Sequence, residues 1–179
     1  MSDTSDALAA LLASYFDEEP STDSWTQRQE FDAEWLSPCQ LGEPDDEGMI
    51  LWRPVRSQTP IDWEQYEARL GCPIRPELKD YYGSYWCSAF ETAIDEGNII
   101  VIQFWNEADR ERRLAGLVDL AARQRDAGES PRLTVAVFTD DRYLSCHLDD
   151  GAILLEDPGR DPRVAFSSLP DFLSTLAAG

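Results

Sequence analysis

Residues 98–125, NIIVIQFWNEADRERRLAGLVDLAARQR, decide the fold because they join a strand pattern directly to a helix pattern. Residues 99–105 are mostly β-branched and aromatic, and the run has the length of a strand that is buried on both faces. Asn106, with Asp109 three residues later, forms a capping-box variant that starts a helix. We therefore expect a central strand that leads into a surface helix.

The helix pattern in this segment is amphipathic. Its apolar residues recur at i, i+3, i+4 and i+7 among Arg and Glu, which is typical of a helix that packs one stripe against a core. Gly128 and Pro131 then break the pattern. The expected buried stripe consists of Leu114, Leu117, Val118 and Ala121.

Length and hydropathy indicate one folded domain. A chain of 179 residues with 42% hydrophobic residues is long enough to bury a substantial core and too apolar to be disordered throughout. No apolar run approaches the roughly 20 residues of a membrane span. The first residues lack the basic region and apolar stretch of a secretory signal, so we expect a cytosolic protein.

The formal net charge of −20 is the largest signal in the composition. It argues against binding to a phosphate backbone or to an anionic lipid surface. Two interpretations remain. The charge is either an acidic coat suited to a saline cytoplasm, which fits a single lysine (Lys79) beside 14 arginines, or a complement to a basic partner. Charge by itself favours the coat.

The chain divides into three parts. Residues 1–19 are expected to form an amphipathic helix that opens at Asp6, residues 20–47 an acidic loop-rich segment, and residues 48–179 an α+β core. Residues 1–47 carry 13 acidic side chains and one basic side chain, Arg28. We expect aromatic side chains to pin the acidic segment to the core: Trp25, Phe31 and Trp35.

The core pattern predicts a single α+β domain with a mixed or antiparallel sheet and a meander-like C-terminal half. Helices are expected from Thr59-Pro60 to Gly71, from Pro76 to Gly83 and after a capping box at residues 168–171. Strands are expected at residues 49–52, 85–89, 133–138, 143–148 and 152–156, with turns at residues 95–98, 140–141 and 149–151.

The sequence offers little for catalysis. The one histidine, His147, follows Cys146, and neighbours on a strand point to opposite faces, so the two cannot form a nucleophile–base dyad. No P-loop, dinucleotide-binding or nucleophile-elbow motif occurs. Paired carboxylates for glycoside hydrolysis stay open, because only the fold defines such pairs. We expect a non-catalytic protein without a cofactor.

No metal or disulfide pattern stands out either. Asp-Asp pairs at 45–46, 140–141 and 149–150 lack the twelve-residue loop of a calcium site, and turns explain the last two more simply. The four cysteines form no C-x-x-C pair, so we expect reduced and partly buried thiols at Cys39, Cys72, Cys87 and Cys146.

Several short motifs occur along the chain in an order and spacing that match a known family. These are Ser37-Pro38-Cys39, Leu51-Trp52-Arg53-Pro54, Leu70-Gly71 followed by residues 74–79, residues 103–109 with Leu114 and Leu117 behind them, and residues 166–173. In this order and spacing the sequence resembles the Syd family of SecY-interacting bacterial proteins and, through it, the SUKH superfamily. The acidic residues 17–47 and the scarcity of lysine depart from that pattern.

The resemblance implies a SUKH-like fold and a binding protein. Syd-like proteins attach peripherally to the cytoplasmic side of the inner membrane by binding the translocon channel SecY, and they restrain or proofread the translocase. Cytoplasmic loops of membrane proteins carry excess Lys and Arg, so an acidic domain complements them without a lipid anchor. The candidate contact residues are Glu91, Asp95, Glu96, Glu107 and Asp109, with Asp140 and Asp141 as a second choice.

Each of these acids also has a simpler interpretation, either a solvated turn or a helix N-terminus, and Asp109 already has the capping role. A second function follows from the superfamily, because many SUKH proteins resemble immunity proteins that neutralise toxins. A basic toxin would suit the acidic surface as well as SecY. An enzyme would require a deep pocket with perturbed carboxylates.

Overall fold

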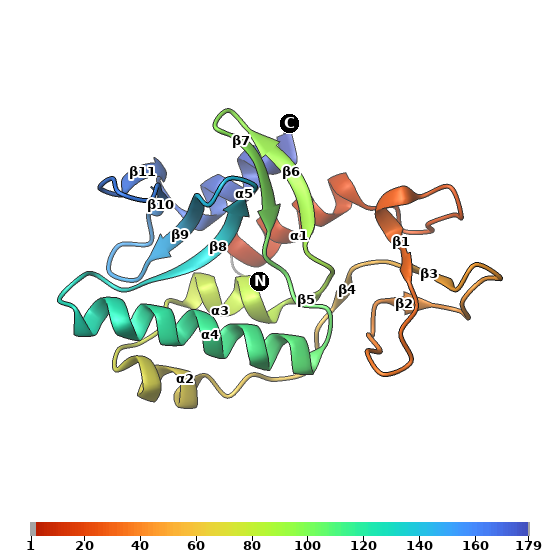
Figure 1. Ribbon diagram of the computed structural model, residues 1–179, viewed down its shortest axis with the longest axis horizontal. Coiled ribbons are helices and arrows are strands. Elements are labelled where there is room, and N and C mark those ends of the chain that lie inside the picture. Colours follow the sequence, from red (N-terminus) through yellow and green to blue (C-terminus); the bar gives the residue numbers. More distant parts are fainter. Residues whose placement is uncertain (1–2, 179) are drawn as a thin grey trace.

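An antiparallel meander of six strands organises the chain in the computed structural model, which describes residues 3–178 except for the side chain of Trp25 (Figure 1). The strand order is β11-β10-β9-β8-β7-β6, and every neighbouring pair is antiparallel. This confirms the α+β class and the C-terminal meander. The strands are β6 (Phe90–Ile94), β7 (Gly97–Val101), β8 (Arg132–Phe138), β9 (Tyr143–His147), β10 (Ile153–Glu156) and β11 (Arg163–Phe166).

Two small sheets accompany the meander. The first has the order β1-β3-β2 and projects to one side, on the right in Figure 1. The second pairs β4 with β5. The acidic segment therefore contains short strands and a 3-10 turn (Trp25–Gln27) in addition to loops. The strands are β1 (Arg28–Glu30), β2 (Gln40–Leu41), β3 (Met49–Trp52), β4 (Val55–Arg56) and β5 (Tyr85–Trp86).

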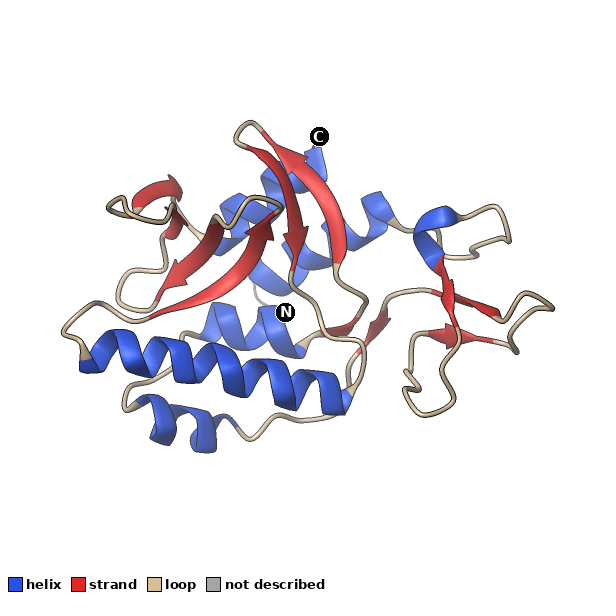
Figure 2. Ribbon diagram, viewed as in Figure 1, coloured by secondary structure: helices blue, strands red, loops and turns tan. Residues whose placement is uncertain are grey.

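Five α-helices of the described residues surround the meander (Figure 2). They are α1 (Asp3–Tyr15), α2 (Trp63–Leu70), α3 (Pro76–Gly83), α4 (Glu107–Asp126) and α5 (Leu169–Ala178). Helix α1 packs against α5 and α3, α4 packs against β8, and α2 packs against α4. Two hydroxyl groups of α3 donate hydrogen bonds to the backbone of β8, Tyr81 to Val135 O at 2.8 Å and Tyr82 to Thr134 O at 2.7 Å.

The apolar run at residues 99–105 is only partly a strand. β7 ends at Val101, and residues 102–105 continue as buried irregular chain, with Ile102 N bonded to Val135 O at 3.0 Å. The expectation of a central strand buried on both faces is wrong for this segment, because Asn98 is exposed and Ile100 is only half-buried on one face of β7, which lies next to the edge strand β6. The strand buried on both faces is β8, where residues 133–136 are all buried.

The helix start at Asn106 is confirmed. Asn106 Oδ1 accepts a hydrogen bond from Asp109 N at 2.8 Å, and Asp109 Oδ2 accepts one from Trp105 N at 3.2 Å, so the reciprocal bond of the box is made to the residue before the cap. The expected stripe is buried except for Leu117, which is half-buried. Arg110, not predicted to be buried, lies inside with its guanidinium over the Trp86 ring at 4.3 Å.

Other helix and strand boundaries differ from the expected ones. α2 begins at Trp63, after Thr59 and Pro60, because Asp62 accepts a hydrogen bond from Gln65 N and caps the helix there. α1 already includes Asp3. The strand expected at residues 85–89 ends at Trp86, and β6 and β11 were not predicted at all. The predicted ends of α2 at Gly71 and α3 at Gly83 agree with the structure.

Candidate functional site

The meander brings two acidic turns together. The β6–β7 turn contains Asp95 and Glu96, and the β8–β9 turn contains Asp140 and Asp141. β7 pairs with β8 so that Ile99 is opposite Phe138, which places both turns at the same end of the sheet. Arg142 links them, since its NH2 group donates to Glu96 O at 3.0 Å and pairs with Asp140 Oδ2 at 2.8 Å.

We call Glu91, Asp95, Glu96, Asp140 and Asp141 the hairpin-end acidic cluster. Glu91 lies further along β6, opposite Ile100 and away from the turn, and it connects to the cluster through Asn98, whose Nδ2 donates to Glu91 Oε1 at 3.3 Å. Arg163 of β11 pairs with Glu96 at 3.0 Å. Of the five carboxylates, only those of Asp140 and Glu96 pair with a guanidinium group, so the cluster keeps a net negative charge. Four of its five acids are exposed.

Within the hairpin-end acidic cluster, the ion pair between Arg142 and Asp140 shifts the pKa of both groups. The hydrogen bonds from Arg142 lower the pKa of Asp140, and the same carboxylate raises the pKa of Arg142. Asp95 and Asp141 are exposed and make no ion pair with any other residue in the range 3–178. Asp141 has φ 68°, a left-handed conformation that Asp tolerates in tight turns. The free carboxylates are therefore at the turns.

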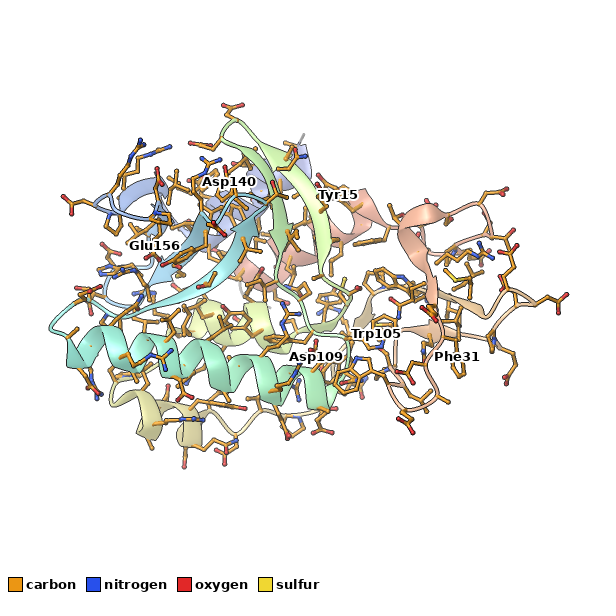
Figure 3. All side chains as sticks on the ribbon, viewed as in Figure 1. Tyr15, Phe31, Trp105, Asp109, Asp140 and Glu156 are labelled. Atoms are coloured by element: carbon orange, nitrogen blue, oxygen red, sulfur yellow. The ribbon has the colours of Figure 1, made fainter. Side chains whose placement is uncertain are left out.

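Glu107 and Asp109 lie apart from the cluster, at the opposite end of β7 where α4 begins. Figure 3 labels Asp109 at the start of α4 and Asp140 near the turns, well separated. Asp109 is 6% exposed, accepts from Trp105 N and pairs with Arg112 at 2.9 Å, so its carboxylate is engaged in the fold. Glu107 is exposed.

Sequence reasoning missed the two arginines that organise the cluster. Arg142 follows the Asp140-Asp141 turn directly, so its position beside an acidic turn was a usable signal. Arg163 belongs to β11, which was not predicted, and only the strand pairing brings it to Glu96.

The one cysteine–histidine neighbour pair is unsuited to nucleophilic catalysis. Cys146 is fully buried, and burial raises the pKa of its thiol to about 12, so it stays protonated at neutral pH. His147 is half-buried and its Nδ1 lies 2.8 Å from Asp150 Oδ1, within the hairpin turn. Of the other thiols, Cys39 and Cys87 are buried and Cys72 is half-buried.

Residues 5–178 match the sequence profile of the family described as "Syd protein (SUKH-2)". The match covers nearly the whole chain. This chain belongs to the Syd family.

Curated relatives agree with this membership. The chain is 31% identical over 150 residues to Protein Syd of Aeromonas hydrophila, covering 82% of this chain and 81% of the relative. It is 27% identical over 150 residues to Protein Syd of Pseudoalteromonas atlantica, covering 82% and 80%. It is 28% identical over 163 residues to Protein Syd of Shewanella halifaxensis, covering 89% and 72%.

In this Syd chain two of the motifs that carried the resemblance meet at one junction. Ser37 Oγ donates to the carbonyl oxygen of Trp105, and Asn106 Nδ2 donates to Leu36 O at 2.8 Å. The Ser37-Pro38-Cys39 motif and the start of α4 are therefore parts of one packed unit. These motifs hold the scaffold together, whereas the hairpin-end acidic cluster lies elsewhere.

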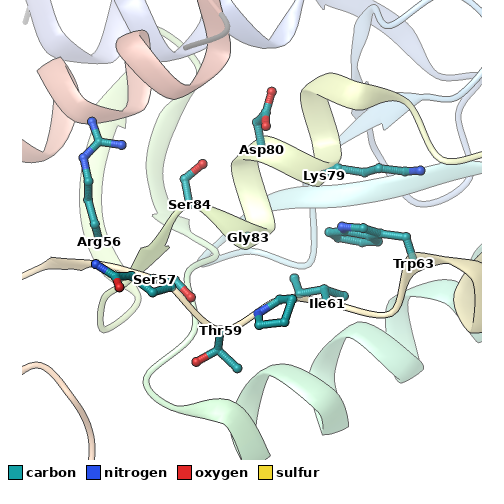
Figure 4. Close-up of a pocket in the computed structure, with 11 residues that line it drawn as sticks. Arg56, Ser57, Thr59, Ile61, Trp63, Lys79, Asp80, Gly83 and Ser84 are labelled. Atoms are coloured by element: carbon teal, nitrogen blue, oxygen red, sulfur yellow. The ribbon is translucent and has the colours of Figure 1, made fainter.

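The Syd fold also contains a shallow pocket of 450 Å³ between α3 and the chain that follows β4 (Figure 4). Trp63 lines it, and Lys79 at its edge pairs with Glu67 at 2.7 Å. Among the described residues, no three His, Cys, Asp or Glu side chains are placed to hold a metal ion. Within residues 3–178, no helix has the length and apolar character needed to cross a bilayer.

Proposed function

We propose that this Syd protein is a non-catalytic binding protein that docks on the basic cytoplasmic loops of SecY and regulates or proofreads the translocase. It would then be a cytoplasmic protein attached peripherally to the inner membrane. The observation that carries the docking site is the hairpin-end acidic cluster, where two adjacent turns present carboxylates to solvent.

Charge complementarity supports this proposal. Cytoplasmic loops of membrane proteins are enriched in Lys and Arg, and the chain carries a net charge of −20. Such complementarity speeds encounter and discriminates against wrong partners. The two turns project beyond the ends of their strands, so an extended loop could reach Asp95 and Asp141 without any change in the sheet.

The test is charge reversal at the cluster. The triple substitution Glu91→Lys, Asp95→Lys and Glu96→Lys should weaken binding to vesicles that contain SecY by at least about 10-fold, because attraction becomes repulsion. Binding is measured by flotation at low salt, and circular dichroism confirms that the variant is folded. Undiminished binding would exclude this surface.

A matched control separates local from overall charge. Glu64→Lys, Glu111→Lys and Asp161→Lys change the net charge by the same amount at exposed positions on α2, on α4 and after β10. This control should bind nearly as well as the native chain. Equal loss in both triples would mean that only total charge matters. If the native chain bound equally well to vesicles that lack SecY, SecY would not be its specific partner.

The alternative partner, a basic toxin, makes a different prediction. A pull-down from a lysate, with the captured protein identified by mass spectrometry, should yield SecY under the proposal. Capture of a basic nuclease encoded beside this chain would instead favour the immunity function of the wider superfamily.

A further inference from the structure

Two adjacent apolar side chains face solvent at the start of α4. Trp35 is 37% exposed and Leu36 is 58% exposed, and among the described residues Val164 is the only other large hydrophobic residue in this class. Single exposed apolar residues are ordinary, but an adjacent aromatic and aliphatic pair is a common element of an interaction surface. The sequence had predicted that Trp35 would pin its segment to the core.

The backbone, rather than the side chains, does the pinning. Trp105 Nε1 donates to Trp35 O at 3.1 Å, and Asn106 Nδ2 donates to Leu36 O at 2.8 Å. Both donors are buried side chains at the β7–α4 junction. The loop is therefore held by its carbonyl groups, while the Leu36 side chain stays mostly exposed and the Trp35 side chain keeps about a third of its surface exposed. A fixed apolar surface loses little conformational entropy when a partner covers it.

Three exposed carboxylates belong to the two segments that meet at this pair. Asp32 and Glu34 are exposed in the same loop, where Asp32 Oδ1 accepts from Glu34 N at 2.8 Å. Glu107 follows Asn106 directly and is exposed. One cation is present, Arg112, whose guanidinium carbon lies 5.9 Å from the centre of the Trp35 ring and which also pairs with Asp109. The apolar pair thus has a mainly negative rim.

We infer that Trp35 and Leu36 form an anchor site for a basic amphipathic segment of a protein partner. Its apolar side chains would cover Trp35 and Leu36, and its Lys or Arg side chains would meet Asp32, Glu34 and Glu107. The negative rim favours a cationic protein segment over an anionic lipid surface. If the partner is SecY, which rests on the proposed function, this Trp35–Leu36 patch is a second contact.

The patch and the hairpin-end acidic cluster are separate surfaces. The turn acids of the cluster and the patch lie at opposite ends of β7, whose four residue steps span about 14 Å at about 3.4 Å each, and Glu91 lies between them, opposite Ile100. A partner that reaches both would gain affinity from two linked contacts, and loss of either would weaken binding without abolishing it.

The double substitution Trp35→Ser and Leu36→Ser tests the anchor. Its matched control is Val164→Ser, at a side chain that is 62% exposed on β11. The first ligand is a synthetic Leu/Lys helical peptide of about 14 residues, with a Leu/Glu peptide of the same length as its counterpart. Affinity is measured by ¹⁵N NMR titration, which also follows the Trp35 indole N–H.

The double variant should bind the Leu/Lys peptide at least about 10-fold more weakly than the native chain, because the anchor pair is lost. Val164→Ser should bind like the native chain, and the Leu/Glu peptide should bind neither. In the native chain the peptide should shift the Trp35 indole signal. Equal peptide affinity in the double variant, or a peptide that leaves Trp35 unshifted, would overturn the inference.

Vesicle binding then distinguishes this inference from the proposed function. Reduced binding of the double variant to SecY vesicles supports both. Peptide binding at Trp35 in a chain that never binds SecY would support the anchor site and refute the SecY assignment. Loss of binding to protein-free vesicles in the double variant alone would show that the patch contacts lipid, and would overturn a protein partner.

Discussion

Asp109 and Glu107 share the first turn of α4, yet their carboxylates have different surroundings. Asp109 is buried and bonds to Trp105 N, whereas Glu107 is exposed. Asp109→Ala should lower the free energy of unfolding by about 2 kcal/mol, because a buried donor loses its acceptor. Glu107→Ala should cost less than about 1 kcal/mol, the loss of a favourable charge near a helix N-terminus.

Urea unfolding at neutral pH measures both losses. Equal losses for the two variants would contradict the capping role of Asp109. A large loss for Glu107→Ala would remove Glu107 from the set of residues free to contact a partner.

The pH dependence of the unfolding free energy tests the burial of the Cys146 thiol. Burial raises the pKa of its thiol from 9.0 to about 12 in the folded protein. Above pH 9 the unfolded chain releases this proton and the folded chain keeps it, so stability is complete below the unfolded pKa and declines as pH rises toward 12. The decline approaches about 1.4 kcal/mol per pH unit for one proton.

Cys146→Ala should therefore reduce the slope of the unfolding free energy against pH above pH 9 by the equivalent of nearly one proton. Urea unfolding across the alkaline range measures this slope. Cys72→Ala, at a half-buried thiol, should flatten it less. An unchanged slope in Cys146→Ala would mean that the thiol already ionises in the folded protein.

At the level of single residues, the sequence predicted what depends on near neighbours. The Asn106–Asp109 cap, the glycine end at Gly71 and the capping box at residues 168–171 all involve groups a few positions apart. Trp35 could not be placed in this way. Whether its side chain or its carbonyl group meets the core depends on Trp105, which lies 70 residues away in sequence.

Glycine is favourable at a helix end that needs a left-handed residue and unfavourable inside a helix. The end of α2 and the interior of α4 allow a paired test of this difference. Gly116 lies in α4, and a Cβ added there would meet no atom within 4 Å, so Gly116→Ala should raise the free energy of unfolding by about 0.5–1 kcal/mol. Gly71 ends α2 at φ 77°, where Arg125 also occupies the space of a side chain. Gly71→Ala should destabilise by about 1 kcal/mol or more.

Thermal and urea unfolding of both variants check the signs. Stabilisation by Gly71→Ala would mean that α2 can end without a left-handed residue. Destabilisation by Gly116→Ala would mean that the exposed face of α4 is covered in the folded protein.

At the scale of helices and strands, local periodicity was enough to predict the long helix α4. The strands that the sequence did not predict, β6 and β11, depend on pairing with neighbouring strands. β6 alternates buried Phe90 and Thr92 with exposed Glu91 and Ala93, but the sequence hides this alternation because the buried Thr92 is polar and the exposed Ala93 is apolar. β11 offers no alternating signal either, because it is a four-residue edge strand with exposed Val164. The central position of β8 follows from sheet order, which no single strand pattern contains.

For the molecule as a whole, the candidate site depends on topology more than on composition. The seven acids proposed from the sequence were chosen for their positions at element ends. The meander order then places two of those ends side by side and the third at the start of α4. Sequence alone therefore identified candidate carboxylates but could not tell which of them share a surface.

The net charge of −20 allows two interpretations that respond differently to salt. Raising KCl from about 0.1 M to about 1 M shortens the Debye length from about 10 Å to about 3 Å. Screening relieves repulsion among the carboxylates of the folded chain, so the free energy of unfolding should rise. If the hairpin-end acidic cluster binds a basic loop, affinity for SecY vesicles should fall over the same range by at least about 10-fold.

Stability and affinity should thus move in opposite directions, and NaCl should reproduce the effect of KCl because screening depends on ionic strength. The triple Lys variant of the cluster should show a much weaker salt dependence of binding, since its attractive charges are gone. Affinity that persists at about 1 M KCl, together with a steep gain in stability, would instead identify the charge as an acidic coat and separate it from partner binding.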